Sequence, residues 1–227
     1  MVQVQDKEVE AFSIADLRRR AHGCLIDPGA RVTPGHNPLA GRSDFDLNPE
    51  LAKLEGADQR RPAAVLVPVI ERENEAHVLF TLRAEHLSSH AGQISFPGGK
   101  MDPRDANVAE TALREAEEEI GLDPRYVETI GFLDDYATST GYRISPLVAV
   151  LHEGYSIAPD NNEVADIFDV PLSFLMDSSN HKLHTRQWRG VRRQFYAMSY
   201  EERFIWGATA GMVRNLYEAL YRTGGDI

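Results

Sequence analysis

Three glutamates near the middle of the chain have the spacing of a metal-binding helix face. Residues 114 to 121 read REAEEEIG. Because each residue of an α-helix turns by about 100°, Glu115, Glu118 and Glu119 fall within roughly 100° of one another, and Glu117 falls on the opposite side. Carboxylates this close repel one another, and a hard divalent cation such as Mg²⁺ or Mn²⁺ removes that repulsion.

The same spacing also occurs on surface helices whose acidic face is simply solvated, so neighbouring residues must distinguish the two interpretations. A stripe of small apolar residues, including Ala112 and Ala116, adjoins the acidic face. The helix can therefore pack on a sheet while its carboxylates face a cleft. Arg114 lies one turn before Glu118 and can orient it. Since protein-bound Mg²⁺ usually also coordinates substrate phosphates, the pattern favours phosphoryl chemistry.

A loop rich in glycine and proline precedes this helix and supplies candidate substrate contacts. Gly98 and Gly99 could form only a turn, but we favour a substrate-binding role, because small residues let a backbone approach a phosphate. Arg83 ends a predicted strand beside the loop and can bind a phosphate or a helix carboxylate, with a plain surface arginine as the alternative. His86 and His90, in the same loop, are expected at the surface.

The elements that must position these residues mix strands and helices. Runs of β-branched and apolar residues predict strands at residues 61–70, 76–84, 126–133, 142–151 and 191–200. Helices are predicted at residues 11–22, 106–120 and 204–222, and a strand leading into a short helix at residues 163–177. Asp105 is the expected N-cap of the central helix, and Gly121 its C-terminal stop. The mixture predicts an α/β or α+β layered domain.

Three other segments receive structural interpretations. Residues 26–61 are rich in Pro, Gly, Asn and Asp and are expected to form an irregular arm. The arginines at positions 189, 192 and 193 are expected on a solvated strand face, although they could also meet the acidic side of a partner subunit. Trp206 and the aromatic residues of the C-terminal helix are expected in the core.

Composition and charge limit the functional classes. A chain of 227 residues, 42% hydrophobic and 26% charged, is expected to form a folded globular protein. Its net charge of −11 disfavours nucleic-acid binding, because such a surface repels phosphates. The single cysteine, Cys24, rules out an intramolecular disulfide and is expected to be a packing residue. With no signal peptide and no membrane-spanning apolar run, we expect a cytoplasmic protein without membrane partners.

Residues 99–122 resemble the Nudix box. That pattern is a glycine, five residues, an acid, a spacer, and then R-E-hydrophobic-x-E-E-x-G-hydrophobic. Residues 114–122 fill every specified position of the second half. Asp105 stands at the first acid, and the spacer that follows it is one residue longer than in the usual box.

The segment LFTLRAEHLSSHAGQISFPGG, residues 79–99, resembles an additional signature of the coenzyme A pyrophosphatase branch of Nudix hydrolases. Two positions depart from it, since Phe80 replaces a Leu or Met and Ser88 replaces an arginine. Further segments are similar to this branch, namely TSTGY at 138–142, NEVA at 162–165, VPL at 170–172 and IWGATA at 205–210.

The resemblance implies a Nudix-type α/β/α sandwich with a mixed β-sheet in residues 61–227, preceded by a helix and irregular arm in residues 1–60. It implies hydrolysis, dependent on Mg²⁺ or Mn²⁺, of a pyrophosphate bond in coenzyme A or its thioesters, giving phosphopantetheine and adenosine 3′,5′-bisphosphate. Carried over residue by residue, Glu115, Glu118 and Glu119 would ligate metal. Arg114 would position them, and Glu163 would act as base or further ligand.

Two alternatives remain open. The loss of a positive charge at Ser88 favours a Nudix hydrolase of another nucleoside diphosphate derivative, such as ADP-ribose. A non-catalytic Nudix module that binds a nucleotide is the third hypothesis, and the intact set of three helix glutamates argues against it. Family analogy also suggests a homodimer as one option for the assembly.

Overall fold

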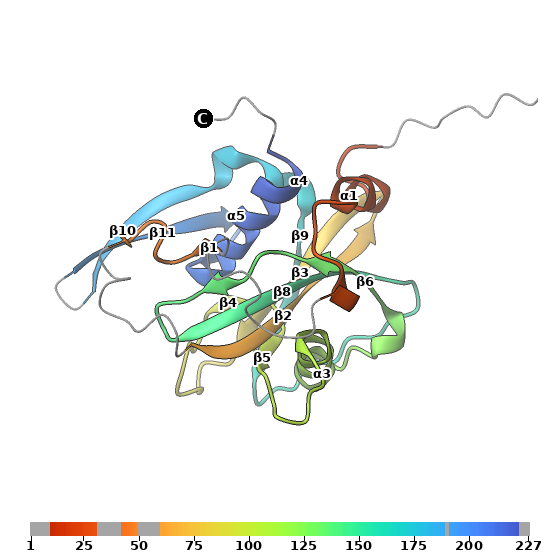
Figure 1. Ribbon diagram of the computed structural model, residues 1–227, viewed down its shortest axis with the longest axis horizontal. Coiled ribbons are helices and arrows are strands. Elements are labelled where there is room, and N and C mark those ends of the chain that lie inside the picture. The colour runs from red at the N-terminus through yellow and green to blue at the C-terminus, as the bar shows by residue number, and fades with distance from the viewer. Residues whose placement is uncertain (1–9, 31–41, 50–59, 189–190, 223–227) are drawn as a thin grey trace, which may run out of the picture.

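The computed structural model describes residues 10–30, 42–49, 60–188 and 191–222, and these form a mixed sheet with helices on both faces (Figure 1). The main sheet has nine strands among the described residues, with the order β1-β7-β8-β2-β3-β4 and with β5, β6 and β9 paired to β2, β8 and β3. Its strands are β1 (Arg42–Ser43), β2 (Arg61–Arg72), β3 (Glu75–Arg83), β4 (Ile94–Ser95), β5 (Gly98–Lys100), β6 (Val127–Phe132), β7 (Tyr136–Ala137), β8 (Tyr142–Leu151) and β9 (Val164–Pro171).

A second sheet of three antiparallel strands consists of β10 (Lys182–Trp188), β11 (Val191–Tyr200) and β12 (Arg203–Trp206). The α-helices are α1 (Ile14–Ala21), α3 (Val108–Ile120), α4 (Leu172–Met176) and α5 (Ala208–Leu220). Short 3-10 turns are η1 (Pro28–Ala30), η3 (Pro124–Tyr126) and η4 (Ser178–Asn180). No described helix combines the length and apolar character needed to cross a membrane.

The central strand β2 explains why the sheet is covered on both faces. Val65 and Val67 belong to the core that also contains residues of α1 and α5, whereas Ala64 and Leu66 belong to the core formed with α3. Successive side chains of a strand point to opposite faces, so an unbroken apolar run requires cover on each side. Because β2 pairs in parallel with β8 and antiparallel with β3, the sheet is mixed, which confirms the predicted α/β sandwich.

Helix α3 begins at a different cap from the one that the sequence predicted. The side chain of Asn107 accepts hydrogen bonds from the backbone N–H groups of Ala109 and Glu110, so the assignment of Asp105 as N-cap is wrong. The prediction of Gly121 as the stop is confirmed, since it has φ 64° and donates to carbonyls of the last turn. The helix buries one apolar stripe against the sheet, consisting of Val108, Ala112, Ala116 and Ile120.

Two predictions at the C-terminal end are corrected. The last helix begins at Ala208 rather than at residue 204, because residues 203–206 form strand β12, which pairs antiparallel with β11. Gly207, at φ 68° and ψ −138°, separates β12 from the helix. Phe204, Ile205 and Trp206 are aromatic or β-branched and favour a strand. Trp206 is only half-buried rather than a core residue. The sequence also failed to predict β10 and β5 as strands.

The N-terminal helix packs on the same core as the main sheet. Leu17 of α1 is fully buried in the cluster that contains α5 residues such as Leu216 and Tyr217. Cys24, just after this helix, is exposed rather than packed as expected. Most of the predicted irregular arm lies outside the described residues, and the division of the chain at residue 60 stays a prediction.

Replacement of Leu17 by alanine should lower the free energy of unfolding by about 2–5 kcal/mol, the usual cost of deleting a fully buried leucine. Urea denaturation would measure this change. The matched control is Ala15→Ser at an exposed position of the same helix, expected within about 0.5 kcal/mol of the parent. Equal stability of both variants would show that α1 is not part of the cooperative core.

Candidate active site

The acidic face of α3 forms one side of a cleft of about 1170 Å³. The cleft brings together six of the residues singled out from the sequence, which come from α3, β5, the end of β3 and the loop before β9. They are Glu115, Glu119, Gly98, Gly99, Arg83 and Glu163. Arg114 and Glu118 do not line it, and the Glu118 side chain is 60% exposed.

Gly98 and Gly99 lie in strand β5, paired antiparallel with β2, so the alternative of a simple turn is wrong. A Cβ atom on Gly98 would overlap the backbone of Ala64 and Val65, and one on Gly99 would overlap the carboxylate of Glu115. Only glycine permits these approaches. The two glycines therefore allow β5 to lie directly against both the central strand and the acidic helix.

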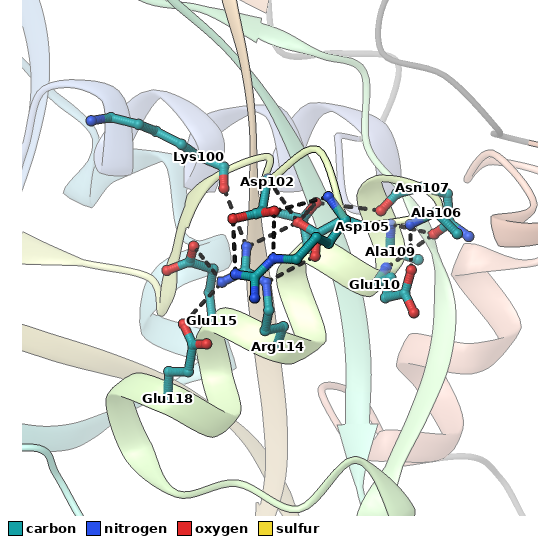
Figure 2. Close-up of polar contacts among 12 residues, drawn as sticks. Lys100, Asp102, Asp105, Ala106, Asn107, Ala109, Glu110, Arg114, Glu115 and Glu118 are labelled. Carbon is teal, nitrogen blue, oxygen red and sulfur yellow. Dashed lines mark hydrogen bonds and ion pairs between the residues drawn. The ribbon is translucent and has the colours of Figure 1, made fainter.

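Arg114 is the centre of a charged network at the acidic face of α3 (Figure 2). Its guanidinium donates from Nε to Asp105 Oδ1 at 2.8 Å and from Nη2 to Asp105 Oδ2 at 2.9 Å. Its Nη1 donates to Glu115 Oε1 and to Glu118 Oε2, each at 2.9 Å. A bidentate pair of this kind fixes the orientation of the guanidinium. Two of the three helix glutamates are thereby held from outside the cleft.

Asp105 is the buried anchor of this network. Besides Arg114, it accepts hydrogen bonds from Thr111 Oγ1 and from the backbone N–H of Asp102, both at 2.9 Å. The hydrogen bonds from Arg114 hold the pKa of the Asp105 carboxyl far below its usual range. The helix begins after Asn107, and Asp105, two residues before this cap, reaches Arg114 despite the longer spacer.

Glu119 is the most buried carboxylate of the acidic face, with a side chain that is 5% exposed. It accepts a hydrogen bond from the Gly98 backbone N–H at 3.1 Å and a long one from Arg83 Nη1 at 3.4 Å. Burial raises the pKa of Glu119 to about 7, and the charges of Glu115 and Glu163 add to the increase. Burial also raises the pKa of Glu115.

The donor set has the chemistry of a site for a hard divalent cation. Within the part of the chain that the structure describes, no three His, Cys, Asp or Glu side chains form a ready-made metal cage. Glu115, Glu119 and Glu163 nevertheless share one cleft, and burial, together with the neighbouring negative charges, raises the pKa values of Glu115 and Glu119. Mg²⁺ commonly takes one or two carboxylates together with waters and substrate phosphates, so an open set of this kind fits it.

Sequence reasoning missed the basic residues on the other walls of the cleft. These are Arg61 at the start of β2, Lys100 in β5, and Arg186 and Arg193 in the β10–β11 hairpin. Arg193 was expected on a solvated face, but it is half-buried and donates to Asp44 Oδ2 at 2.6 Å. Such residues lie far apart along the chain. The one available signal was strand alternation, which puts Arg193 on the same face as Phe195.

Replacement of Glu119 by glutamine should raise the free energy of unfolding of the metal-free protein by about 2 kcal/mol more at pH 8 than at pH 5. This figure follows because a shift of one pKa unit corresponds to about 1.4 kcal/mol. The raised pKa means that the folded protein retains a proton which the unfolded chain releases above about pH 4.5. Parent stability therefore falls as pH rises towards 7, and the glutamine variant lacks this loss. Urea denaturation in EDTA would measure it.

The control for this experiment is Glu117→Gln, which removes an exposed charge from the same helix. Its effect on stability should not change between the two pH values. If the effect of Glu119→Gln on stability were also independent of pH, the raised pKa of Glu119 would be contradicted.

Comparison with known proteins identifies the family. Residues 60–192, more than half of the chain, match the family model of the NUDIX domain. The chain is 40% identical over 156 residues to an uncharacterized Nudix hydrolase, NudL, of Yersinia pestis (strain Pestoides F), a match that covers 69% of this chain and 78% of that protein. NudL of Yersinia pseudotuberculosis serotype O:1b (strain IP 31758) matches with the same identity and coverage.

Among solved structures, a Nudix hydrolase from M. smegmatis, RenU, has a TM-score of 0.44 and 24% identity, covering 52% of this chain and 74% of that one. The family match and the identity to the Yersinia proteins agree with the glutamate-rich helix α3 and the mixed sheet beneath it. The chain therefore belongs to the Nudix hydrolase family.

Proposed function

We propose that this Nudix hydrolase cleaves a pyrophosphate bond of coenzyme A or its thioesters, with Mg²⁺ or Mn²⁺ as cofactor, giving phosphopantetheine and adenosine 3′,5′-bisphosphate. The observation that carries the proposal is the meeting of Glu115, Glu119 and Glu163 with Arg83 and Lys100 in one cleft of about 1170 Å³. A cleft of this size accommodates a nucleotide-sized ligand. The choice of coenzyme A rests on the similarity of residues 79–99 to the signature of that branch.

The carboxylates of α3 are the proposed ligands of the cation, through Glu115, Glu118 and Glu119. A bound divalent cation polarises phosphate oxygens and lowers the pKa of an attacking water. Arg114 keeps Glu115 and Glu118 oriented through hydrogen bonds of 2.9 Å to each. Its own anchor, Asp105, stays ionised because Arg114 lowers its pKa. The acidic face is thus pre-organised before substrate arrives.

Glu163 is the proposed general base or further ligand. It lies in the loop before β9, and its backbone carbonyl accepts a hydrogen bond from the Ala84 N–H at 2.8 Å, which ties the loop to the end of β3. Its side chain is exposed to solvent in the cleft, and its charge acts on both Glu115 and Glu119. A carboxylate in this position can take a proton from water beside the metal-binding face.

Arg83, Gly98 and Gly99 are the proposed contacts for the substrate phosphates. The Arg83 side chain makes a long hydrogen bond to Glu119, and its buried Nε has no hydrogen-bond partner among the described residues. A buried donor without a partner is costly, and a phosphate oxygen would satisfy it. Gly98 and Gly99 line the cleft, where backbone without a side chain lets a phosphate approach closely.

Hydrolysis of another nucleoside diphosphate derivative, such as ADP-ribose, is the second candidate. Ser88 favours it, because the coenzyme A signature has an arginine at this position. Ser88 is exposed and does not line the cleft, which weakens this argument. The third candidate, a non-catalytic nucleotide-binding module, is disfavoured by the intact glutamate set of α3.

Incubation of the protein with coenzyme A and Mg²⁺ or Mn²⁺ should release phosphopantetheine and adenosine 3′,5′-bisphosphate, detected by mass spectrometry, and EDTA should abolish the release. ADP-ribose, dinucleotides and nucleoside triphosphates form the comparison panel. Turnover of ADP-ribose without turnover of coenzyme A would replace the first candidate by the second. Absence of metal-dependent turnover across the whole panel would favour the non-catalytic module.

Replacement of Glu118 by glutamine should lower kcat by about 100-fold or more, since loss of groups that merely support a metal site already costs about 10–100-fold. Glu118 is exposed, so the variant should keep its fold, which circular dichroism would verify. Glu117→Gln, at the adjacent exposed position, is the matched control and should retain parental activity. Equal kcat values for the two variants would show that Glu118 takes no part in the reaction.

A further inference from the structure

The cleft has a second charged end, opposite in sign to the α3 carboxylates. We define the basic end as Arg61, Arg186 and Arg193, which line the same cleft as Glu115 and Glu119. Among the described residues that line the cleft, Asp44 is the carboxylate that contacts this group, through Arg193. In a chain with a net charge of −11, a concentration of arginines inside a cleft marks a place for an anion.

The contacts between these residues form a continuous wall. The Arg61 guanidinium lies over the Tyr142 ring at 4.4 Å from its centroid, and the Tyr142 carbonyl accepts a hydrogen bond from the Thr138 N–H. The next residue, Ser139, donates to Asp44 from its backbone and its hydroxyl, at 3.0 and 2.9 Å. Asp44 in turn holds Arg193.

Arg186 is the member of this wall that is best placed to take a ligand. It lies directly opposite Arg193 in the antiparallel pair of β10 and β11. Like charges in this position repel each other. Arg193 is compensated by Asp44, whereas Arg186 is exposed and forms no ion pair with any described residue. A phosphate between the strands and the cleft would compensate it through charge-assisted hydrogen bonds.

The floor of the cleft sets the spacing between the two ends. Arg61, Ala63 and Val65 alternate along β2 and all line the cleft. Val65 pairs with Gly98, whose N–H binds Glu119. Four residues of strand separate this position from Arg61, or roughly 13 Å between backbone positions. Because an arginine side chain reaches several residues' width into the cleft, the distance between the two charged ends can be shorter than this backbone distance. It can then match the distance between two phosphates carried by one ribose.

Aromatic side chains lie on the same face of the hairpin as the two arginines. Phe195 and Trp206 line the cleft with ring centroids 5.4 Å apart, and both are half-buried. Rings of this kind provide an apolar surface against which a planar nucleobase can stack. A base beside a phosphate-binding arginine is the arrangement that a nucleoside phosphate requires.

We propose that the basic end binds a second phosphate on the ribose of the substrate, so that the cleft selects nucleoside 5′-diphosphate derivatives with a 3′-phosphate over those without one. This inference rests on the proposed function and extends it to the origin of specificity. The residue that carries the discrimination is Arg186, supported by Arg61, while Arg193 is fixed by Asp44.

Calorimetric titration of the protein with adenosine 3′,5′-bisphosphate and with adenosine 5′-monophosphate tests the proposal without any turnover. The bisphosphate should bind about tenfold more tightly or better, as expected for one additional charge-assisted contact. Arg186→Gln should bring the two affinities to within about twofold of each other. Arg192→Gln removes an exposed charge from the adjacent strand position outside the cleft, and it should leave the ratio as in the parent.

Equal affinity of the parent protein for the two nucleotides would overturn the proposal, as would an Arg192→Gln variant that loses the preference as completely as Arg186→Gln. Kinetics provide the second measurement, in which Arg186→Gln should raise KM for coenzyme A more than KM for 3′-dephospho-coenzyme A. A protein that prefers the bisphosphate but does not hydrolyse coenzyme A would support the subsite and overturn only the proposed reaction.

Discussion

The acidic face of this protein depends on one buried ion pair, between Arg114 of α3 and Asp105 of the loop that leads into the helix. Carboxylates on neighbouring positions of a helix repel one another, and each gains freedom by turning into solvent. A planar guanidinium with several donors can hold more than one of them, provided that its own orientation is fixed. Asp105 provides that fixed point because Thr111 and the Asp102 backbone use its remaining oxygen sites.

In the same region, the burial of Glu119 lowers the stability of the folded protein but suits a site that binds a ligand. Glu119 is buried with one backbone hydrogen bond and a long contact to Arg83, which together do not balance the loss of hydration. Gly98 and Gly99 contribute to this burial, because they allow β5 to lie directly against α3. Buried groups with perturbed pKa values and incomplete partners are typical of functional sites, where a ligand completes the charge balance.

The far wall of the cleft is assembled from segments that precede and follow the α3 region. Asn48 accepts from the Gln194 N–H at 2.7 Å and donates to its carbonyl at 2.8 Å, so its amide pairs with the edge of β11. Asp44, four residues earlier, binds Arg193 and the Tyr136 hydroxyl. These two residues lie before the match to the family model, which begins at residue 60. The N-terminal segment thus shapes a wall of the cleft that residues 99–122 do not provide.

The sequence by itself determined the features that depend on local order. The strand β2, the helix α3, the stop at Gly121 and the shared face of Glu115 and Glu119 follow from hydrophobic runs, helix periodicity and glycine conformation, which act over a few residues. The same local reasoning misassigned Asp105 as a cap, because a helix cap and an ion-pair anchor both favour an aspartate before the helix.

The tertiary structure decided which distant residues meet. It separated Glu118 from the cleft lining, joined β12 to β11 where a helix was expected, and gathered Arg61, Arg186 and Arg193 at one end of the cleft. No spacing rule connects Arg61 with the two hairpin arginines, which lie more than a hundred positions later in the chain. Their contact depends on strand pairing and on the register of the hairpin, which are fixed only when the two faces of the sheet are packed.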